Sequence, residues 1–180
     1  GVGGQGTLLA SRILGKVAIK EGYDVKVSEV HGMSQRGGSV VTYVKYGDKV
    51  YSPIIDRGEA DLILAFEMLE AMRALPYLKK GGKMIANTQK MNPMPVITGA
   101  MEYPENIEEK LSAKINLQAV DALSLAEKAG TIKAVNVVLI GLLAKSMDVD
   151  KNVWIDVIKE TVPEKFLDVN IKAFELGYEL

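Results

Sequence analysis

Two glycine-containing segments near the amino end carry the residues that could do chemistry. The first, Gly1-Val2-Gly3-Gly4-Gln5-Gly6, has the spacing G-x-G-x-x-G and runs directly into a helical pattern. Glycines let a backbone approach an anion closely, and the first N–H groups of a helix carry about half a positive charge. A phosphate or a carboxylate would suit this loop, although the same glycines could serve only to pack a helix against a strand.

The second segment runs from His31 to Ser39 and places a cation, an amide and hydroxyls among glycines. It follows a short alternating strand, so we expect it at the same sheet edge as the first loop. Arg36 offers planar, bidentate donors to a phosphate or to another subunit, with a surface salt bridge as the alternative. His31 is the only histidine, and a hydrogen-bonded structural role is favoured over proton transfer. Two such loops suit a large polar or phosphorylated ligand, or a rigid contact with another subunit.

A dinucleotide-binding interpretation of the first loop needs an acidic residue about 20 positions further on, at the end of the second strand. Glu29 occupies an acceptable position for that role. The same motif normally follows a β-strand, and the sequence begins at the motif itself. We therefore expect that an N-terminal strand is missing before Gly1.

The composition excludes several classes of chemistry. The 180 residues contain no cysteine and one histidine, which removes disulfides, thiolate-bound iron–sulfur clusters, cysteine nucleophiles and His-rich metal centres. A net charge of −1 supplies no field that would attract nucleic acid or an anionic membrane. The apolar stretch from Ala134 to Ala144 is shorter than the roughly 20 residues of a membrane span, and it predicts a buried core helix. Since no leader pattern is recognisable, we expect a cytoplasmic protein.

Periodicity predicts alternating strands and helices. Short links between them favour an α/β, three-layer, Rossmann-like fold with a mostly parallel sheet, an antiparallel hairpin and a C-terminal helical segment, in one domain over residues 1–180. The hairpin is expected from residues 39–46 and 49–55 around Gly47-Asp48, and a long loop is expected over residues 88–105. Met91, Met94 and Met101 in that loop could form an adaptable apolar interface, or the loop could be an insertion packed on itself. The expected helices span 7–21, 68–78, 104–113, 122–128, 133–147, 151–161 and 164–178, and the other strands lie at 25–27, 60–66, 83–87 and 115–120.

The two loops with their flanks, Gly1 to Ala10 and Ser28 to Val40, resemble the gamma-type subunits of the 2-oxoacid:ferredoxin oxidoreductases, and most of all the beta subunits of the indolepyruvate-specific members. The resemblance extends over nearly the whole chain in length and order of elements. The two loops carry most of its specificity.

This resemblance implies a noncatalytic, site-completing subunit of an enzyme that oxidatively decarboxylates 2-oxoacids, here an aryl pyruvate such as indolepyruvate, with ferredoxin as acceptor. It implies that thiamine diphosphate and 4Fe-4S clusters belong to a large partner subunit and that coenzyme A is shared with this chain. Two alternatives stay open: a self-sufficient NAD(P)-binding oxidoreductase, and an assembly module that binds coenzyme A or a related nucleotide. The residues that the resemblance places at the ligand- or partner-facing edge are Gly3, Gly4, Gln5, Gly6, Ser34, Gln35, Arg36, Gly37 and Gly38.

Overall fold

A computed structural model describes residues 1–29 and 37–180 of the chain, so His31, Ser34, Gln35 and Arg36 lie outside the described residues. Its strands form a parallel sheet of order β3-β4-β5 and an antiparallel pair of β1 with β2. The strands are β1 (Asp24–Glu29), β2 (Thr42–Gly47), β3 (Ala60–Ala65), β4 (Leu78–Asn87) and β5 (Asn116–Val120). The helices are α1 (Thr7–Lys20), α2 (Met68–Ala74), α3 (Met94–Ile97), α4 (Ile107–Ser112), α5 (Ala122–Ala129), α6 (Val135–Lys145), α7 (Lys151–Thr161) and α8 (Leu167–Tyr178).

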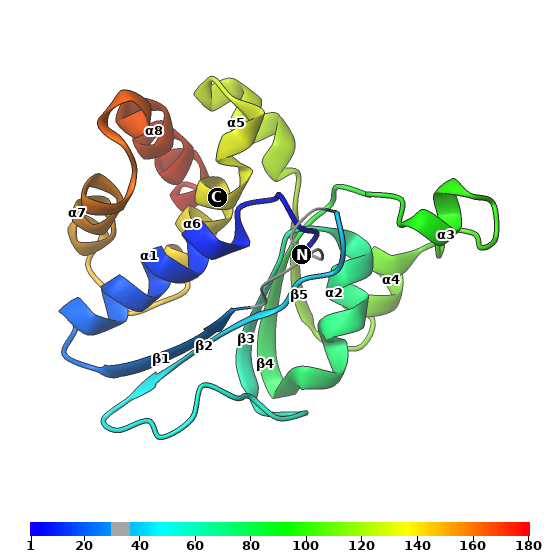
Figure 1. Cartoon of the computed structure of the whole chain (residues 1–180), viewed down its shortest axis with the longest axis horizontal. Helices are drawn as coiled ribbons and strands as arrows, with labels where there is room; N and C mark the ends of the chain where they lie inside the picture. Colours follow the sequence, from blue (N-terminus) through cyan, green and yellow to red (C-terminus); the bar gives the residue numbers. More distant parts are fainter. Residues whose placement is uncertain (30–36) are drawn as a thin grey trace.

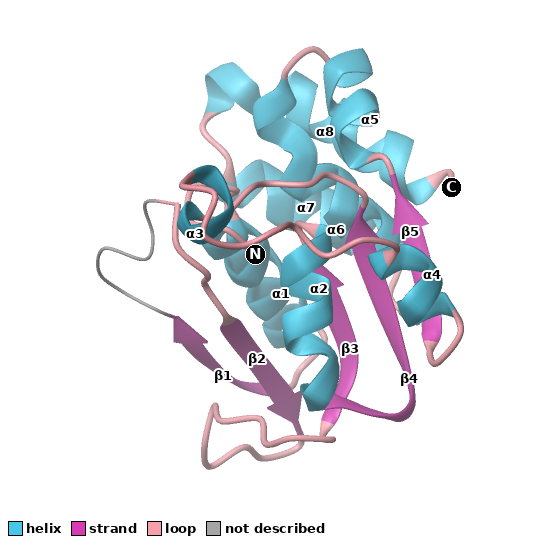
Figure 2. Ribbon diagram, turned by 90° about the vertical axis from the view of Figure 1, so that its right-hand side faces the viewer, coloured by secondary structure: helices cyan, strands magenta, loops and turns pink. Residues whose placement is uncertain are grey.

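Helices cover both faces of the parallel sheet, which gives the expected three layers (Figure 1). Helices α2 and α4 pack on one face, and α6 packs on the other with α8 behind it. Helix α1 lies along the β1–β2 pair and also contacts α6 and α7. Figure 2 shows the two groups of strands side by side with the helices around them. The α/β class, the parallel sheet, the antiparallel pair and the helical C-terminal segment are confirmed.

The expected partners of the antiparallel pair were wrong. Strand β2 pairs with β1 over its whole length, from Asp24 opposite Gly47 to Glu29 opposite Thr42, and residues 49–55 form no strand. The Asp24 carboxylate accepts a hydrogen bond from Val50 N at 2.9 Å, which turns the chain away after β2. Pro53 also has no backbone N–H to offer a ladder. The chain bends at Asp48, as the Gly47-Asp48 pair predicted, but the strand predicted after it does not form.

The interior is built around α6, as the apolar stretch predicted. Every residue of α6 from Val135 to Ala144 is buried. None of the described helices combines the length and the hydropathy needed to cross a bilayer. Helix α8 crosses α6 so closely that a Cβ at Gly141 would overlap the carbonyl of Phe174, and one at Gly177 would overlap the carbonyl of Val138. Two glycines therefore set the spacing of the main helix pair.

We expect Gly141→Ala and Gly177→Ala each to lower the free energy of unfolding by about 1–3 kcal/mol, because the added methyl forces two packed backbones apart. The matched control is Gly47→Ala in β2, where a Cβ meets nothing within 4 Å and which should leave stability nearly unchanged. Chemical denaturation of the three variants measures the difference. Equal stabilities for Gly141→Ala and Gly47→Ala would contradict the close crossing.

Candidate functional site

The two glycine segments lie against each other at the carboxyl end of β3. Residues 1–3 form a short antiparallel ladder with residues 37–40, which is the described end of the second loop. The bonds are Gly1 N to Val40 O (2.9 Å), Val40 N to Gly1 O (2.8 Å), Gly3 N to Gly38 O (2.8 Å) and Gly37 N to Gly3 O (3.1 Å). The described part of the second loop thus shares an edge with the first, as expected.

The first loop ends in a turn that only glycine fits well. Gly6 is the N-cap of α1 at φ 79°, and a Cβ there would overlap the Asn136 side chain, whose Nδ2 donates to Gly6 O at 3.2 Å. Gly4 has φ 102°, and no atom of residues 1–29 or 37–180 lies within 4 Å of the position of a Cβ there. The α1 terminus has no side-chain cap. Its first N–H groups therefore suit an anion that approaches past Gly4.

Gln5 braces this loop from inside. Its Oε1 accepts from Val2 N at 2.8 Å, and its Nε2 donates to Phe66 O at 2.9 Å. These bonds fasten the glycine turn to the end of β3. The expected contact of Gln5 with a ligand or a partner stays a prediction, as it does for Gly3, Gly4, Gly6, Gly37 and Gly38.

A buried carboxylate that the sequence did not indicate lies beside this loop. Glu67, 1% exposed, follows β3 and accepts from Glu70 N at 2.9 Å, from Met91 N at 3.1 Å and from the Tyr103 hydroxyl. The Tyr103 hydroxyl in turn accepts from Leu69 N at 3.1 Å. Burial, and then the bond to Glu67, raises the pKa of Tyr103, so the phenol stays a neutral donor. No signal in the sequence distinguishes this glutamate from a surface one.

Glu67 ties down both ends of a projecting segment, residues 92–102, which we call the arm. Figure 1 shows its short helix α3 standing away from the body of the protein. Of the three methionines expected to form an apolar interface, Met94 and Met101 are 66% and 65% exposed, whereas Met91 is half-buried just before the arm. Ile97 of the arm is 65% exposed as well. Apolar side chains exposed close together are typical of an interaction surface, which stays a prediction for the arm. The alternative of an insertion packed on its own core is not favoured, because these side chains face solvent.

A second buried carboxylate joins α2 to the second glycine segment. Glu70 is 4% exposed and accepts from the Ser39 hydroxyl at 2.6 Å and from an Arg73 guanidinium nitrogen at 2.5 Å. Ser39 directly follows the two glycines of the ladder. Helix α2 therefore supports the second glycine segment through Glu70, and its N-cap residue Glu67 supports the arm.

Glu67→Gln should lower the free energy of unfolding by about 1–3 kcal/mol. The reason is that the NH₂ group of glutamine is a donor, and it would face the backbone N–H or phenol groups that now donate to Glu67. It should also speed amide exchange in the arm, whose two ends it releases. Hydrogen exchange with mass spectrometry measures the arm, and denaturation measures stability.

Glu102→Gln, an exposed residue of the arm itself, is the matched control and should change neither property. The assignment of Glu67 as the tie of the arm is wrong if exchange over residues 92–102 is the same in both variants.

A layered α/β sheet with a glycine turn at a helix N-terminus, on its carboxyl edge, defines a Rossmann-like domain. The chain belongs to the pyruvate ferredoxin/flavodoxin oxidoreductase family, whose profile matches residues 1–180. It is 45% identical to the indolepyruvate oxidoreductase subunit IorB of Thermococcus kodakarensis, over 98% of this chain and 91% of that protein. The resemblance read from the two glycine loops is thereby confirmed.

Two solved structures show the same fold. The gamma subunit of a keto/oxoacid ferredoxin oxidoreductase from Geobacter sulfurreducens superposes with a TM-score of 0.71 at 24% identity, over 99% of this chain and 92% of that one. A 2-oxoglutarate:ferredoxin oxidoreductase from Magnetococcus marinus gives a TM-score of 0.71 at 17% identity, over 98% of this chain but 29% of that one. In the second protein this fold is a fraction of a much longer polypeptide.

Proposed function

We propose that this chain is the small, noncatalytic subunit of an indolepyruvate:ferredoxin oxidoreductase that works in the cytoplasm and completes the site of a large partner subunit. The observation that carries the proposal is 45% identity to an indolepyruvate oxidoreductase subunit over 98% of the chain. The glycine turn at the start of α1 and the exposed apolar side chains of the arm support it, since both are suited to binding at another subunit.

The redox cofactors belong to the partner in this proposal. The sequence has no cysteine, so it offers no thiolate for a 4Fe-4S cluster. Within residues 1–29 and 37–180 there is also no group of three or more His, Cys, Asp or Glu side chains that could hold a metal ion. The residues of this chain therefore do not fit the clusters, and we assign thiamine diphosphate and the clusters to the large subunit. Electrons would reach ferredoxin through the complex.

In this proposal, the glycine turn at the start of α1 binds a phosphate of coenzyme A. Among the described residues, no side chain caps the N-terminus of α1 and no atom lies within 4 Å of a Cβ at Gly4, and the first backbone N–H groups of such a helix suit a phosphate. Gly3, Gly4 and Gly6 would hold that phosphate, with Gly37 and Gly38 beside them in the same ladder. Ser34, Gln35 and Arg36, which lie outside the described residues, stay the sequence-based candidates for further contacts with coenzyme A. Coenzyme A supplies the thiol that takes up the acyl group. The Magnetococcus marinus neighbour was solved with coenzyme A bound.

Co-expression with the large subunit should give a stable complex whose oxidation of indolepyruvate, measured as ferredoxin reduction, requires this chain. The reason is that, in this proposal, the glycine turn of this chain completes the site of the large subunit by holding a phosphate of coenzyme A. The control omits this chain and keeps the large subunit loaded with its cofactors. Full activity of the large subunit alone would overturn the proposal.

The arm provides a sharper test of the contact. Replacing Met94, Ile97 and Met101 together by serine should weaken binding to the large subunit roughly tenfold or more, because three exposed apolar anchors are lost without disturbing the core. The matched control replaces Ile19, Ile54 and Ile132, which are 61%, 49% and 57% exposed elsewhere on the surface. Affinity is measured by biolayer interferometry on the purified subunits. Equal affinities for the two triple variants would remove the arm from the interface.

The self-sufficient NAD(P) alternative has weaker support from the geometry. Glu29 accepts a hydrogen bond from the Ser11 hydroxyl at 3.1 Å at the end of β1. Among the described residues, those that pair with the start of the glycine turn are 37–40, which lead into β2. A ribose-binding carboxylate is expected on the strand adjacent to the loop. Titration with NAD(H) distinguishes the two functions, since micromolar binding with turnover of a hydroxy acid would favour the alternative.

A further inference from the structure

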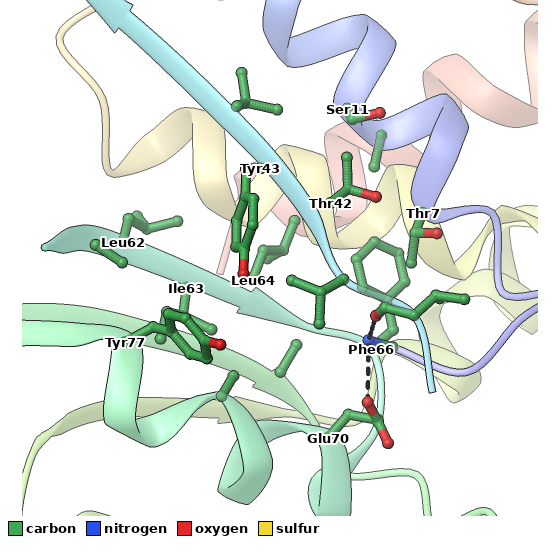
Figure 3. Close-up of a pocket in the computed structure, with 18 of the residues that line it drawn as sticks. Thr7, Ser11, Thr42, Tyr43, Leu62, Ile63, Leu64, Phe66, Glu70 and Tyr77 are labelled. Carbon is green, nitrogen blue, oxygen red and sulfur yellow. Dashed lines mark hydrogen bonds and ion pairs between the residues drawn. The ribbon is translucent and has the colours of Figure 1, made fainter. Parts of the chain in front are cut away.

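A polar cavity that the proposed function does not use lies at the start of β4 and β5. Its volume is about 430 Å³, and we call it the lysine pocket, after Lys79, Lys80 and Lys114 in its lining. A different cavity, of about 210 Å³ between β2 and β3, has a mostly apolar lining that includes Tyr43 and Leu64 (Figure 3). Of these two, the lysine pocket alone has a volume within the roughly 300–1,000 Å³ typical of small-molecule pockets.

The lysine pocket lies at the opposite end of the parallel sheet from the glycine turn. Leu78 and Asn116, the first residues of β4 and β5, line it. Figure 2 shows the arrows of β3, β4 and β5 pointing the same way, so their amino ends share one edge. The glycine turn is bonded to Phe66, just past the carboxyl end of β3. The pocket is therefore separate from the site described above.

An irregularity in β4 forms one wall of the lysine pocket. The step from Ala60 to Leu62 in β3 is matched by the step from Leu78 to Lys83 in β4, and the pairing with β5 begins at Lys83. Residues 79–82 thus have no register partner in the described strands on either side. Such a bulge takes backbone and side chains out of the regular ladder, which here directs them to the pocket.

The bulge contains two glycines with different surroundings. A Cβ at Gly82 would lie 2.9 Å from Asp61 O and 2.9 Å from Leu78 Cδ1, so glycine is needed there for close packing. Gly81 has φ 82°, and no atom of residues 1–29 or 37–180 lies within 4 Å of the position of a Cβ there. A glycine in such a position lets a ligand approach the main chain closely.

Two of the three lysines in the pocket have uncompensated charges within the described part of the chain. Lys79 donates to Asp61 at 2.9 Å. Lys80 and Lys114 are exposed, and neither makes a hydrogen bond or an ion pair with residues 1–29 or 37–180. Lysines near helix ends can also bind the last carbonyls of a helix, but neither ammonium group donates to the described ends of α2 or α4. Like charges around one cavity attract an anion instead.

We propose that the lysine pocket binds a phosphate group, either as the free ion or as part of a small molecule. The ammonium groups of Lys80 and Lys114 supply the charge, and the Ser112 hydroxyl and the Asn116 amide in the same lining are further donors. A phosphate group presents three strong acceptor oxygens and between one and two negative charges, which suits this set of donors. The inference does not depend on the proposed function, because the pocket and the glycine turn lie at opposite ends of the sheet.

Titration of the purified chain at constant ionic strength, followed by NMR of its backbone amides, tests the proposal. Inorganic phosphate and adenosine monophosphate are the two probes. We expect saturable shifts of the Gly81 and Gly82 amides with at least one of them, because these amides line the pocket. Tighter binding of the nucleotide assigns the site to a phosphate on a larger molecule, and equal or weaker binding assigns it to the free ion. Absence of saturable shifts at both glycines, including a response confined to the glycine turn, would overturn the proposal.

A matched pair of double variants tests the role of the lysines. Lys80→Gln with Lys114→Gln should weaken phosphate binding roughly tenfold, because two charge-assisted hydrogen bonds become neutral ones. The control, Lys128→Gln with Lys172→Gln, removes the same charge from exposed positions on α5 and α8 and should leave the midpoint of the titration within about twofold of the unaltered chain. Equal weakening in the two double variants would mean that the anion responds to net charge alone, and the pocket would then not be a site.

Discussion

The backbone ladder between residues 1–3 and 37–40 is the interaction on which the rest of the arrangement depends. It holds the start of α1 and the entry to β2 at one fixed separation, and with them the two glycine segments. Each of its hydrogen bonds contributes about 0.5–1.5 kcal/mol net, so the ladder is a modest source of stability. Its importance is geometric, because it holds the residues that lead into β2 against the start of the chain, at the carboxyl end of β3.

The end of β3 is where this ladder is coupled to the remainder of the molecule. Phe66 O accepts both Gln5 Nε2 and Asn87 Nδ2, and Asn87 Oδ1 accepts Ala122 N at 3.1 Å. The glycine turn, the end of β4 and the start of α5 are thereby bonded around one carbonyl. The next residue, Glu67, holds the arm. The adjacent residues Phe66 and Glu67 thus connect the glycine turn with the arm.

Local signals predicted most elements, and tertiary contacts decided what the sequence could not show. Helix α7 has the expected bounds because its apolar period is strong and Asp150 caps it. Gly22 ends α1 at φ 87°, as expected of a glycine after a helix. The pairing of β2 was mispredicted because Gly47-Asp48 favours a turn whichever strand follows. After the turn, Val50 N donates to Asp24, a residue more than 20 positions earlier whose contact the local sequence does not reveal. Glu67 and Asn87 went unnoticed because buried polar residues are recognised by their partners, not by their type.

Hydrogen bonds of Phe66 and Glu67 connect the arm to the glycine turn. Glu67 is 1% exposed and accepts from three groups, of which Glu70 N is buried and the other two are half-buried. A network around a buried carboxylate is costly to leave partly satisfied, so these bonds are expected to form together. In the proposed complex, a partner bound at Met94, Ile97 and Met101 would be connected through Glu67 to the end of β3 and so to the glycine turn. A defined relative position of two proteins would favour a reaction whose groups are divided between them, because orientation lowers the barrier.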